Sequence, residues 1–175
     1  MIISLAGYMG SGKSHIAKLL SEKINFELID LDKEIILKNK SSIAEIFEKK
    51  GEIYFRKLER ETLEEILATR ENSILSLGGG TPVYYNNIEV INNRSESIYL
   101  KANIPTLVQR LAPNKTKRPL IAKLEDDALP EFIAKHLFER TPYYSKCKYT
   151  VSTDHKQPEE VIAEIIQILD LPQAT

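Results

Sequence analysis

Three glycines, a serine and a lysine near the start of the chain stand at a spacing that suits phosphate binding. The stretch GYMGSGKS at positions 7–14 fits the pattern G-x-x-x-x-G-K-[ST], with an apolar run before it and an amphipathic run after it. Glycines let backbone N–H groups turn toward phosphate oxygens, and the N-terminus of the following helix adds a positive dipole. Lys13 is therefore expected to reach the β- and γ-phosphates, and the Ser14 hydroxyl to ligate Mg²⁺. The stretch predicts a loop that holds a nucleoside triphosphate, rather than a glycine-rich turn without a ligand.

Two aspartates, Asp30 and Asp32, stand at the end of the second apolar run, in the sequence LIDLD. Ligands of open α/β sheets collect at the carboxyl ends of the strands. On an extended segment, two carboxylates two residues apart would point the same way, toward that crevice. One would steer Mg²⁺ through water while the other accepts a proton from a substrate hydroxyl. The alternative for Asp32 is that it only caps a helix starting at Lys33.

The stretch GEIYFRKLERE at 51–61 places Glu52, Arg56 and Glu59 on one face of a helix. Such a ladder is usually exposed to solvent, where each ion pair is worth about 0.3–0.5 kcal/mol. The alternative is the wall of a pocket for a small carboxylate, because an aromatic side chain, Phe55, adjoins the planar guanidinium of Arg56. Both interpretations stay open on the sequence alone.

Further along, three consecutive glycines and two arginines are candidates for the same site. The glycines at 78–80 end the third apolar run, where they allow a ligand to approach the backbone closely or simply form a turn. Arg118 lies in the basic segment 112–125. An arginine that closes over phosphates can contribute about 10³–10⁵ in rate, whereas a solvated one contributes close to nothing. The sequence around Arg140 does not show whether this residue belongs to the site.

The elements that must position these residues follow from hydrophobic periodicity. Most of the apolar runs are continuous, as expected for a parallel sheet covered on both faces. We expect strands at 2–6, 26–30, 74–77, 97–100 and 149–152, and helices at 13–23, 43–49, 52–69, 106–111, 130–146 and 159–169. This alternation predicts an α/β sheet with right-handed crossovers. Consecutive helices within 32–70 predict an insertion beside the sheet, and 112–125, with two prolines, predicts a mobile loop.

Composition narrows the class of protein. At 175 residues, with 42% hydrophobic and 28% charged residues, the chain suits one globular domain. A net charge of −1 provides no field that would attract nucleic acid or an anionic membrane. The single cysteine, Cys147, excludes an internal disulfide and suits a reducing compartment. No apolar stretch approaches the roughly 20 residues of a membrane-spanning helix. The sequence therefore predicts a cytoplasmic protein with no nucleic-acid or membrane partner.

Taken in order, the motifs resemble those of shikimate kinases over nearly the whole chain. They are GYMGSGKS, DLD, the block SIAEIFEKKGEIYFRKLE, GGG, KRPL and ERTPYY. Many families share the first motif, the P-loop, but GE-x-x-FR-x-x-E with GGG and a later RPL is far more specific. The resemblance implies transfer of the ATP γ-phosphate to the 3-hydroxyl of shikimate, in chorismate and aromatic amino-acid biosynthesis.

The resemblance also implies a fold and an organisation. The fold would be an α/β P-loop NTPase fold of the nucleoside-monophosphate-kinase type, with three layers and a five-stranded parallel sheet. The chain, 1–175, would be a single kinase domain and a monomer, with a substrate-binding insertion at about 32–60 and a lid at about 112–124.

The resemblance assigns roles to individual residues. It makes three residues catalytic, with the aspartate as base and the arginine on the lid: Lys13, Asp32 and Arg118. ATP would contact Gly10, Ser11, Gly12, Lys13, Ser14, His15, Arg110, Arg118 and Pro158. Shikimate would contact Asp32, Phe55, Arg56, Gly78, Gly79, Gly80 and Arg140. Mg²⁺ would be held by Ser14 and, through water, by Asp30.

One departure and two competing functions complete the prediction. The family usually has threonine before the three glycines, where this chain has Leu77, so a hydroxyl that could order a metal-bound water is missing, although Ser76 is adjacent. Another small-molecule kinase, such as a gluconate or nucleoside-monophosphate kinase, would need a different acceptor pocket from the FR and GGG arrangement. The alternative from another class is a nucleotide-dependent switch or binding module that hydrolyses slowly. Its guanine-reading segment would be expected to show Asn-Lys-x-Asp, and the nearest match, NKTK at 114–117, ends in lysine.

Overall fold

The computed structural model of the chain describes residues 1–171, without the side chain of Lys117. Within these residues one sheet has the strand order β2-β3-β1-β4-β5, and each neighbouring pair is parallel. The strands are β1 (Ile2–Ala6), β2 (Glu27–Asp30), β3 (Ser73–Ser76), β4 (Glu96–Lys101) and β5 (Tyr149–Ser152). The predicted five-stranded parallel sheet is thereby confirmed.

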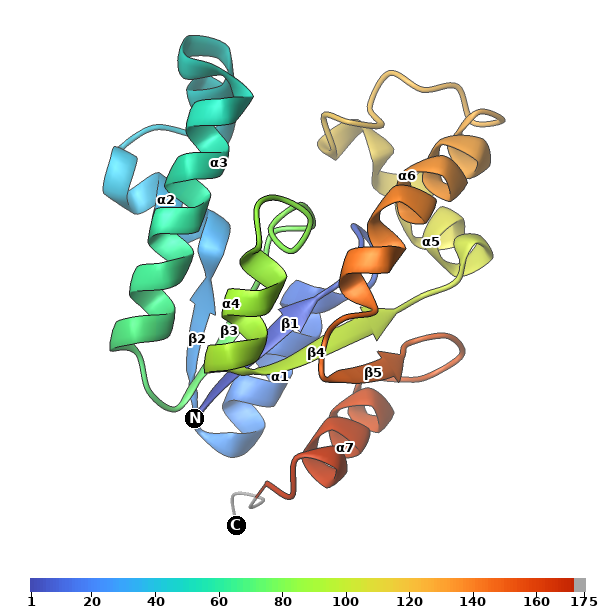
Figure 1. Cartoon of the computed structure of the whole chain (residues 1–175). Helices are drawn as coiled ribbons and strands as arrows, with labels where there is room; N and C mark the ends of the chain where they lie inside the picture. Colours follow the sequence, from blue (N-terminus) through green and yellow to red (C-terminus); the bar gives the residue numbers. More distant parts are fainter. Residues whose placement is uncertain (172–175) are drawn as a thin grey trace.

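Helices cover both faces of this sheet and give three layers (Figure 1). They are α1 (Lys13–Ile24), α2 (Leu31–Asn39), α3 (Ile43–Thr69), α4 (Asn87–Arg94), α5 (Ile104–Leu111), the 3₁₀ helix η1 (Ala112–Lys117), α6 (Leu129–Tyr144) and α7 (Pro158–Ile168). Because successive side chains of a strand point to opposite faces, β1 serves two cores. Ile3 and Leu5 pack with α1 and α7, whereas Ile2 and Ala6 face the core that α3, α4, α5 and α6 complete.

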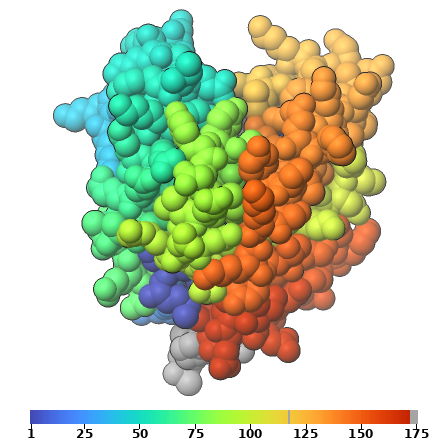
Figure 2. All heavy atoms as spheres, in the orientation of Figure 1, coloured from blue at the N-terminus to red at the C-terminus, as the bar shows by residue number. Residues whose placement is uncertain are grey.

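The carboxyl ends of the strands meet at the upper edge of the sheet in Figure 1. β1 runs from there into the phosphate-binding loop, β2 ends at Asp30, and β3 leads into the three glycines. Figure 2 shows a hollow at this edge, between α3 and the segment that links α5 to α6. Parallel topology therefore brings the three sequence motifs to one side of the molecule.

Several expected boundaries need correction. Phe26 precedes β2, and Leu77 follows β3, although its side chain is buried in the core. The helix α4 was not expected, because its sequence NIEVINNR is short and rich in asparagine, with a weak apolar pattern. The helix break expected near position 50 is confirmed, since Gly51 has φ 80 and ψ 171 inside α3.

The basic segment 112–125 has more local structure than the expected loop. It begins with η1 and continues in turns, and Ile121 is fully buried in the core. Lys115 Nζ donates to the carbonyl oxygen of Leu124 at 2.6 Å and also pairs with Asp126. Two roles stay predictions: that of 112–124 as a lid and that of 32–60 as a substrate-binding insertion. Within residues 1–171, no helix is long and apolar enough to cross a membrane.

Candidate active site

The phosphate-binding loop joins β1 to α1 and turns around Lys13. Gly12 is the N-cap of α1 at φ 95, in the left-handed region that favours glycine. Lys13 Nζ donates to the carbonyl oxygens of Gly7 at 2.7 Å and Tyr8 at 3.1 Å. Burial, and next the charge of Arg118, lowers the pKa of Lys13 to about 8. Lys13 and Arg118, the two cations predicted to bind the phosphates, therefore lie close enough for the charge of Arg118 to lower the pKa of Lys13.

A cavity of about 210 Å³ opens beside this loop, and five of its nine lining residues are ones that the sequence assigns to ATP. The lining residues are Ser11, Gly12, His15, Ile16, Arg110, Thr153, Lys156, Pro158 and Val161. Arg110 Nη1 donates to Thr153 Oγ1 at 3.0 Å and to the carbonyl of Gly10 at 3.3 Å, and Nη2 donates to the carbonyl of Thr153 at 2.9 Å. A fixed guanidinium plane and a proline ring thus line one cavity, an arrangement suited to a planar base.

The two aspartates do not lie on one extended segment, so this expectation is wrong. β2 ends at Asp30 and the backbone becomes helical at Leu31, which puts Asp32 in the first turn of α2. Asp30 is the N-cap, and its side chain accepts a hydrogen bond from the backbone N–H of Lys33 at 3.2 Å. Asp30 therefore performs the capping that the alternative gave to Asp32. Aspartate is favoured at an N-cap, and negative charge is favoured in a first helical turn, which explains the early start of the helix.

Asp32 instead faces the glycines after β3. Its Oδ1 lies 3.1 Å from where a Cβ would stand on Gly78. Burial, followed by the charges of Asp30 and Glu59, raises the pKa of Asp32 to about 6. A carboxylate with such a pKa is ionised at neutral pH and still basic enough to accept a proton in a reaction.

Each of the three glycines leaves room for one predicted substrate-binding side chain. A Cβ on Gly79 would lie 3.3 Å from Arg140 Nη1, and a Cβ on Gly80 would lie 2.7 Å from Arg56 Nη1. A Cβ on Gly78 would lie 3.1 Å from Asp32 Oδ1. The glycines therefore gather one carboxylate and two guanidinium groups from α2, α3 and α6 at the end of β3.

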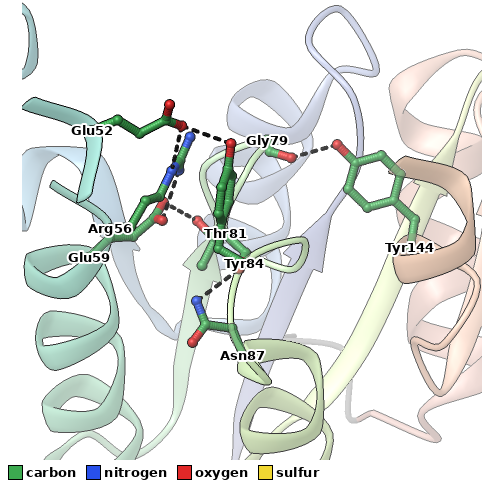
Figure 3. A network of polar contacts seen from close by, with 8 residues as sticks. All are labelled: Glu52, Arg56, Glu59, Gly79, Thr81, Tyr84, Asn87 and Tyr144. Atoms are coloured by element: carbon green, nitrogen blue, oxygen red, sulfur yellow. Dashed lines mark hydrogen bonds and ion pairs between the residues drawn. The ribbon is translucent and has the colours of Figure 1, made fainter. Parts of the chain in front are cut away.

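Arg56 belongs to a largely buried network, so the exposed-ladder interpretation is wrong for this residue and for Glu59. Their side chains are 12% and 1% exposed, and Arg56 Nη1 donates to Glu59 Oε2 at 2.9 Å. Thr81 Oγ1 donates to the other oxygen of Glu59 at 2.7 Å (Figure 3). Burial alone would lower the pKa of Arg56, but the charge of Glu59, its hydrogen bond to Arg56 and the charges of Tyr84 and Glu52 together outweigh this effect and raise the pKa.

Phe55 packs in the core beneath Arg56. Its side chain is 3% exposed, its ring centroid lies 4.6 Å from that of Phe47, and Arg56 Cζ lies 5.0 Å from it. The ring supports the guanidinium group, and the role of Phe55 in the wall of a substrate pocket stays a prediction.

The helix α6 contacts both the phosphate-binding loop and the glycines. Arg140 lies inside this helix. Tyr144 Oη donates to the carbonyl of Gly79 at 2.6 Å, and the Tyr8 hydroxyl and His136 Nδ1 are 2.9 Å apart. Arg118 follows η1, is exposed, and donates its backbone N–H to the carbonyl of Lys115 at 2.9 Å.

Sequence reasoning did not assign roles to several residues that complete the site. Asn87 is fully buried, and its Nδ2 donates to the carbonyl of Thr81 at 2.9 Å, which fixes the loop after the glycines. Glu59 could have been found, because it shares a helix face with Arg56. Nothing in the sequence distinguishes Asn87, Tyr84 or Lys156 from other surface-type residues.

Known proteins resemble this chain along nearly its whole length. The family model described as shikimate kinase matches residues 9–170. A shikimate kinase from Flavobacterium psychrophilum is 49% identical over 168 residues, which are 95% of this chain and 98% of that protein. The crystal structure of a shikimate kinase from Bacteroides thetaiotaomicron superposes with a TM-score of 0.91 at 35% identity, over 98% of this chain and 99% of that one. A shikimate kinase from Acinetobacter baumannii, solved in complex with shikimate, superposes with a TM-score of 0.85 at 31% identity, over 96% of this chain and 92% of that one.

Proposed function

The chain belongs to the shikimate kinase family, and from this premise we propose how its residues share the reaction. It is an ATP-dependent kinase that transfers the γ-phosphate of ATP to the 3-hydroxyl of shikimate, giving shikimate 3-phosphate and ADP. The proposal concerns the residue roles, the metal ion, the assembly and the compartment.

One observation supports the acceptor site above all others: side-chain atoms of Asp32, Arg140 and Arg56 lie 3.1, 3.3 and 2.7 Å from where a Cβ would stand on Gly78, Gly79 and Gly80. Two guanidinium groups at one strand end suit the carboxylate of shikimate, because arginine binds carboxylates with paired N–H donors. A carboxylate on the third side suits a hydroxyl that must lose its proton. Asp32 then binds the 3-hydroxyl and acts as the base.

ATP occupies the phosphate-binding loop and the adjoining cavity in this proposal. The backbone of Gly10, Ser11 and Gly12 and the amine of Lys13 bind the phosphates. The base lies in the cavity, between Arg110 and the segment that ends at Pro158. His15 lines the same cavity and contacts the nucleotide.

The residues present fit Mg²⁺. Ser14 is exposed in the first turn of α1, and Asp30 lies at the end of β2, which β3 separates from β1. No group of three or more His, Cys, Asp or Glu that could hold a metal occurs within residues 1–171, so protein ligands alone do not form the site. Mg²⁺ prefers such a site, with few protein oxygens, several waters and the phosphates of a nucleotide. When bound, it neutralises charge on the phosphates.

In the reaction, the residues of the chain act mainly by positioning and by charge. Arg56 and Arg140 orient shikimate so that Asp32 meets the hydroxyl in line with the leaving ADP oxygen. Lys13 and Arg118 stabilise the negative charge of the transferring group. Closure of 112–124 over the phosphates excludes water and limits hydrolysis of ATP.

We also propose a monomer in the cytoplasm as the working form. All of the assigned site residues come from one chain, so no second copy is needed to complete the site. The buried, free Cys147 suits a reducing compartment, and the net charge of −1 favours small-molecule partners over nucleic acid or a membrane surface.

A coupled ADP-release assay with shikimate as the only acceptor tests the proposed function. Shikimate should stimulate ADP release strongly over the ATPase background, whereas gluconate and nucleoside monophosphates should not. The Lys13→Met variant should lose the stimulated rate and serve as the blank. Equal stimulation by another acceptor, or none by shikimate, would reject the acceptor assignment.

A further inference from the structure

Tyr84 lies in the loop between the glycines and α4, and its side chain covers Arg56 (Figure 3). Arg56 Cζ is 3.9 Å from the centroid of the tyrosine ring, a stacking distance for a guanidinium group on an aromatic face. The Tyr84 hydroxyl donates to Glu52 Oε1 at 2.7 Å, and Arg56 Nε donates to the same oxygen at 3.4 Å. Tyr84 therefore contacts Arg56 through its ring and Glu52 through its hydroxyl, and Glu52 in turn contacts Arg56.

These contacts define which parts of Arg56 remain available to a ligand. Glu59 accepts a hydrogen bond from Nη1, Glu52 accepts one from Nε, and the Tyr84 ring covers one face of the planar guanidinium group. Nη2 has no hydrogen-bond acceptor among the residues that the structure describes, and it lies 2.9 Å from where a Cβ would stand on Gly80. The edge that carries Nη2 is thus the part of the guanidinium group left for the proposed substrate carboxylate, with Gly80 packed close beside it.

The hydroxyl of Tyr84 also orients the Glu52 carboxylate beside this edge. Its hydrogen bond is the main cause that lowers the pKa of Glu52, and burial, followed by this bond, raises the pKa of Tyr84. The hydrogen bond therefore holds Glu52 Oε1 beside Arg56 Nε, although the Glu52 side chain is 52% exposed. Without the tyrosine hydroxyl, an exposed glutamate would lose most of this orientation, because a long exposed side chain resists immobilisation.

We propose that Tyr84 is a positioning residue for shikimate, which holds the Arg56 guanidinium plane so that the edge that carries Nη2 meets the substrate carboxylate. The inference rests on the proposed role of Arg56 and adds a residue outside the glycine and arginine motifs. Glu59 holds Arg56 through Nη1, Tyr84 adds a second contact on the face of the guanidinium group, and preorganisation of this group favours binding. The effect belongs to the binding of the acceptor and not to ATP, whose proposed site lies around Lys13 and Arg110.

The next residue along the chain offers a matched control. Tyr85 contacts Arg60 at 5.6 Å from Cζ to ring centroid, and Arg60 Nη1 donates to Asn86 Oδ1 at 2.6 Å. This pair fastens the same loop to the same helix, α3, but no Arg60 atom is among the three nearest to a Cβ placed on Gly78, Gly79 or Gly80. Replacement of Tyr85 therefore tests loop attachment without touching the acceptor site.

The experiment compares Tyr84→Leu, Tyr84→Phe and Tyr85→Leu by steady-state kinetics and thermal unfolding. Tyr84→Leu should raise the KM for shikimate between about threefold and thirtyfold, the range expected from loss of a cation–π contact. The KM for ATP should stay within about twofold. Tyr84→Phe keeps the stacked ring and should recover most of the loss. Tyr85→Leu should leave both KM values unchanged, and a loss of shikimate binding in it equal to that of Tyr84→Leu would overturn the inference.

Two further variants separate failure of this inference from failure of the proposed function. If Arg56→Ala leaves the KM for shikimate unchanged, Arg56 does not bind the substrate and its proposed role is wrong. If Arg56→Ala raises that KM but Tyr84→Leu does not, only the role of Tyr84 is wrong. In the double variant Arg56→Ala/Tyr84→Leu, the tyrosine replacement should add nothing further. Multiplication of the two effects would show that Tyr84 acts independently of Arg56 and would reject the inference.

Discussion

Replacement of Gly80 by alanine should damage shikimate binding with little effect on the fold. The backbone of Gly80 is not among those with positive φ, so alanine fits its conformation. The added Cβ, however, would lie 2.7, 2.9 and 3.1 Å from Nη1, Nη2 and Cζ of Arg56. Because these atoms are the far end of a flexible side chain, the guanidinium group moves while the backbone stays.

The size of the effect follows from this displacement. To reach an ordinary contact of 3.4 Å from 2.7 Å, the guanidinium group must retreat by about 0.7 Å. A shift of that size disrupts a charge-assisted hydrogen bond, worth about 1.5–3 kcal/mol. The KM for shikimate should therefore rise about 10- to 100-fold. The ion pair with Glu59 is strained too, so we expect a loss of about 1 kcal/mol in the free energy of unfolding, or about 2–4 °C in Tm.

The assay is the coupled measurement of ADP release at varied shikimate and saturating ATP, with thermal unfolding in parallel. Gly79→Ala is the matched control, because its Cβ would stand 3.3 Å from Arg140 Nη1, a tight contact without a severe clash. It should change the KM for shikimate less than Gly80→Ala does. A Gly80→Ala protein with unchanged Tm and unchanged KM for shikimate would refute the reasoning. A fall of 10 °C or more would mean that the backbone, and not Arg56, takes up the clash.

Three further predictions use the same assays. Arg118→Ala should keep its Tm, because the side chain is exposed, but lose about 10³-fold or more in kcat; near-normal turnover would remove the lid role. Asp32→Asn should lose turnover yet gain stability, because burial raises the pKa of Asp32 from 3.8 to about 6 and the ionised form therefore destabilises the fold. Its advantage in free energy of unfolding over the wild type should grow from near zero at pH 4 to about 3 kcal/mol above pH 7, measured by urea unfolding; an advantage independent of pH would contradict this. Arg110→Leu should raise the KM for ATP about fivefold or more and leave that for shikimate unchanged, because Arg110 lines the cavity beside the phosphate-binding loop; an equal change in both would contradict the assignment.

The phosphate-binding loop could be predicted from the sequence in detail because its chemistry is local. Consecutive residues supply the backbone N–H groups, the lysine and the hydroxyl, and the strand and helix that flank the loop are adjacent in the chain. The break at Gly51 and the strand β1 are local in the same sense, and both were predicted at their observed positions. The start of α2 at Leu31 also depends only on neighbouring residues. Asp30 and Asp32, however, fit either an extended strand end or a capped helix, so the sequence did not decide between them.

The acceptor site depends on contacts that no local pattern contains. Arg56 and Gly80, or Arg140 and Gly79, meet only because the strand order puts β3 between β2 and β1 and lets α3 and α6 reach its end. Burial of Glu59 has the same origin, since a helical ladder of charges becomes a buried ion pair only where another segment, here Thr81, covers it. Sequence alone determined the fold class and the nucleotide loop, because these need only neighbouring residues. Packing between distant segments decided which arginines face the acceptor and which carboxylate is free to take its proton.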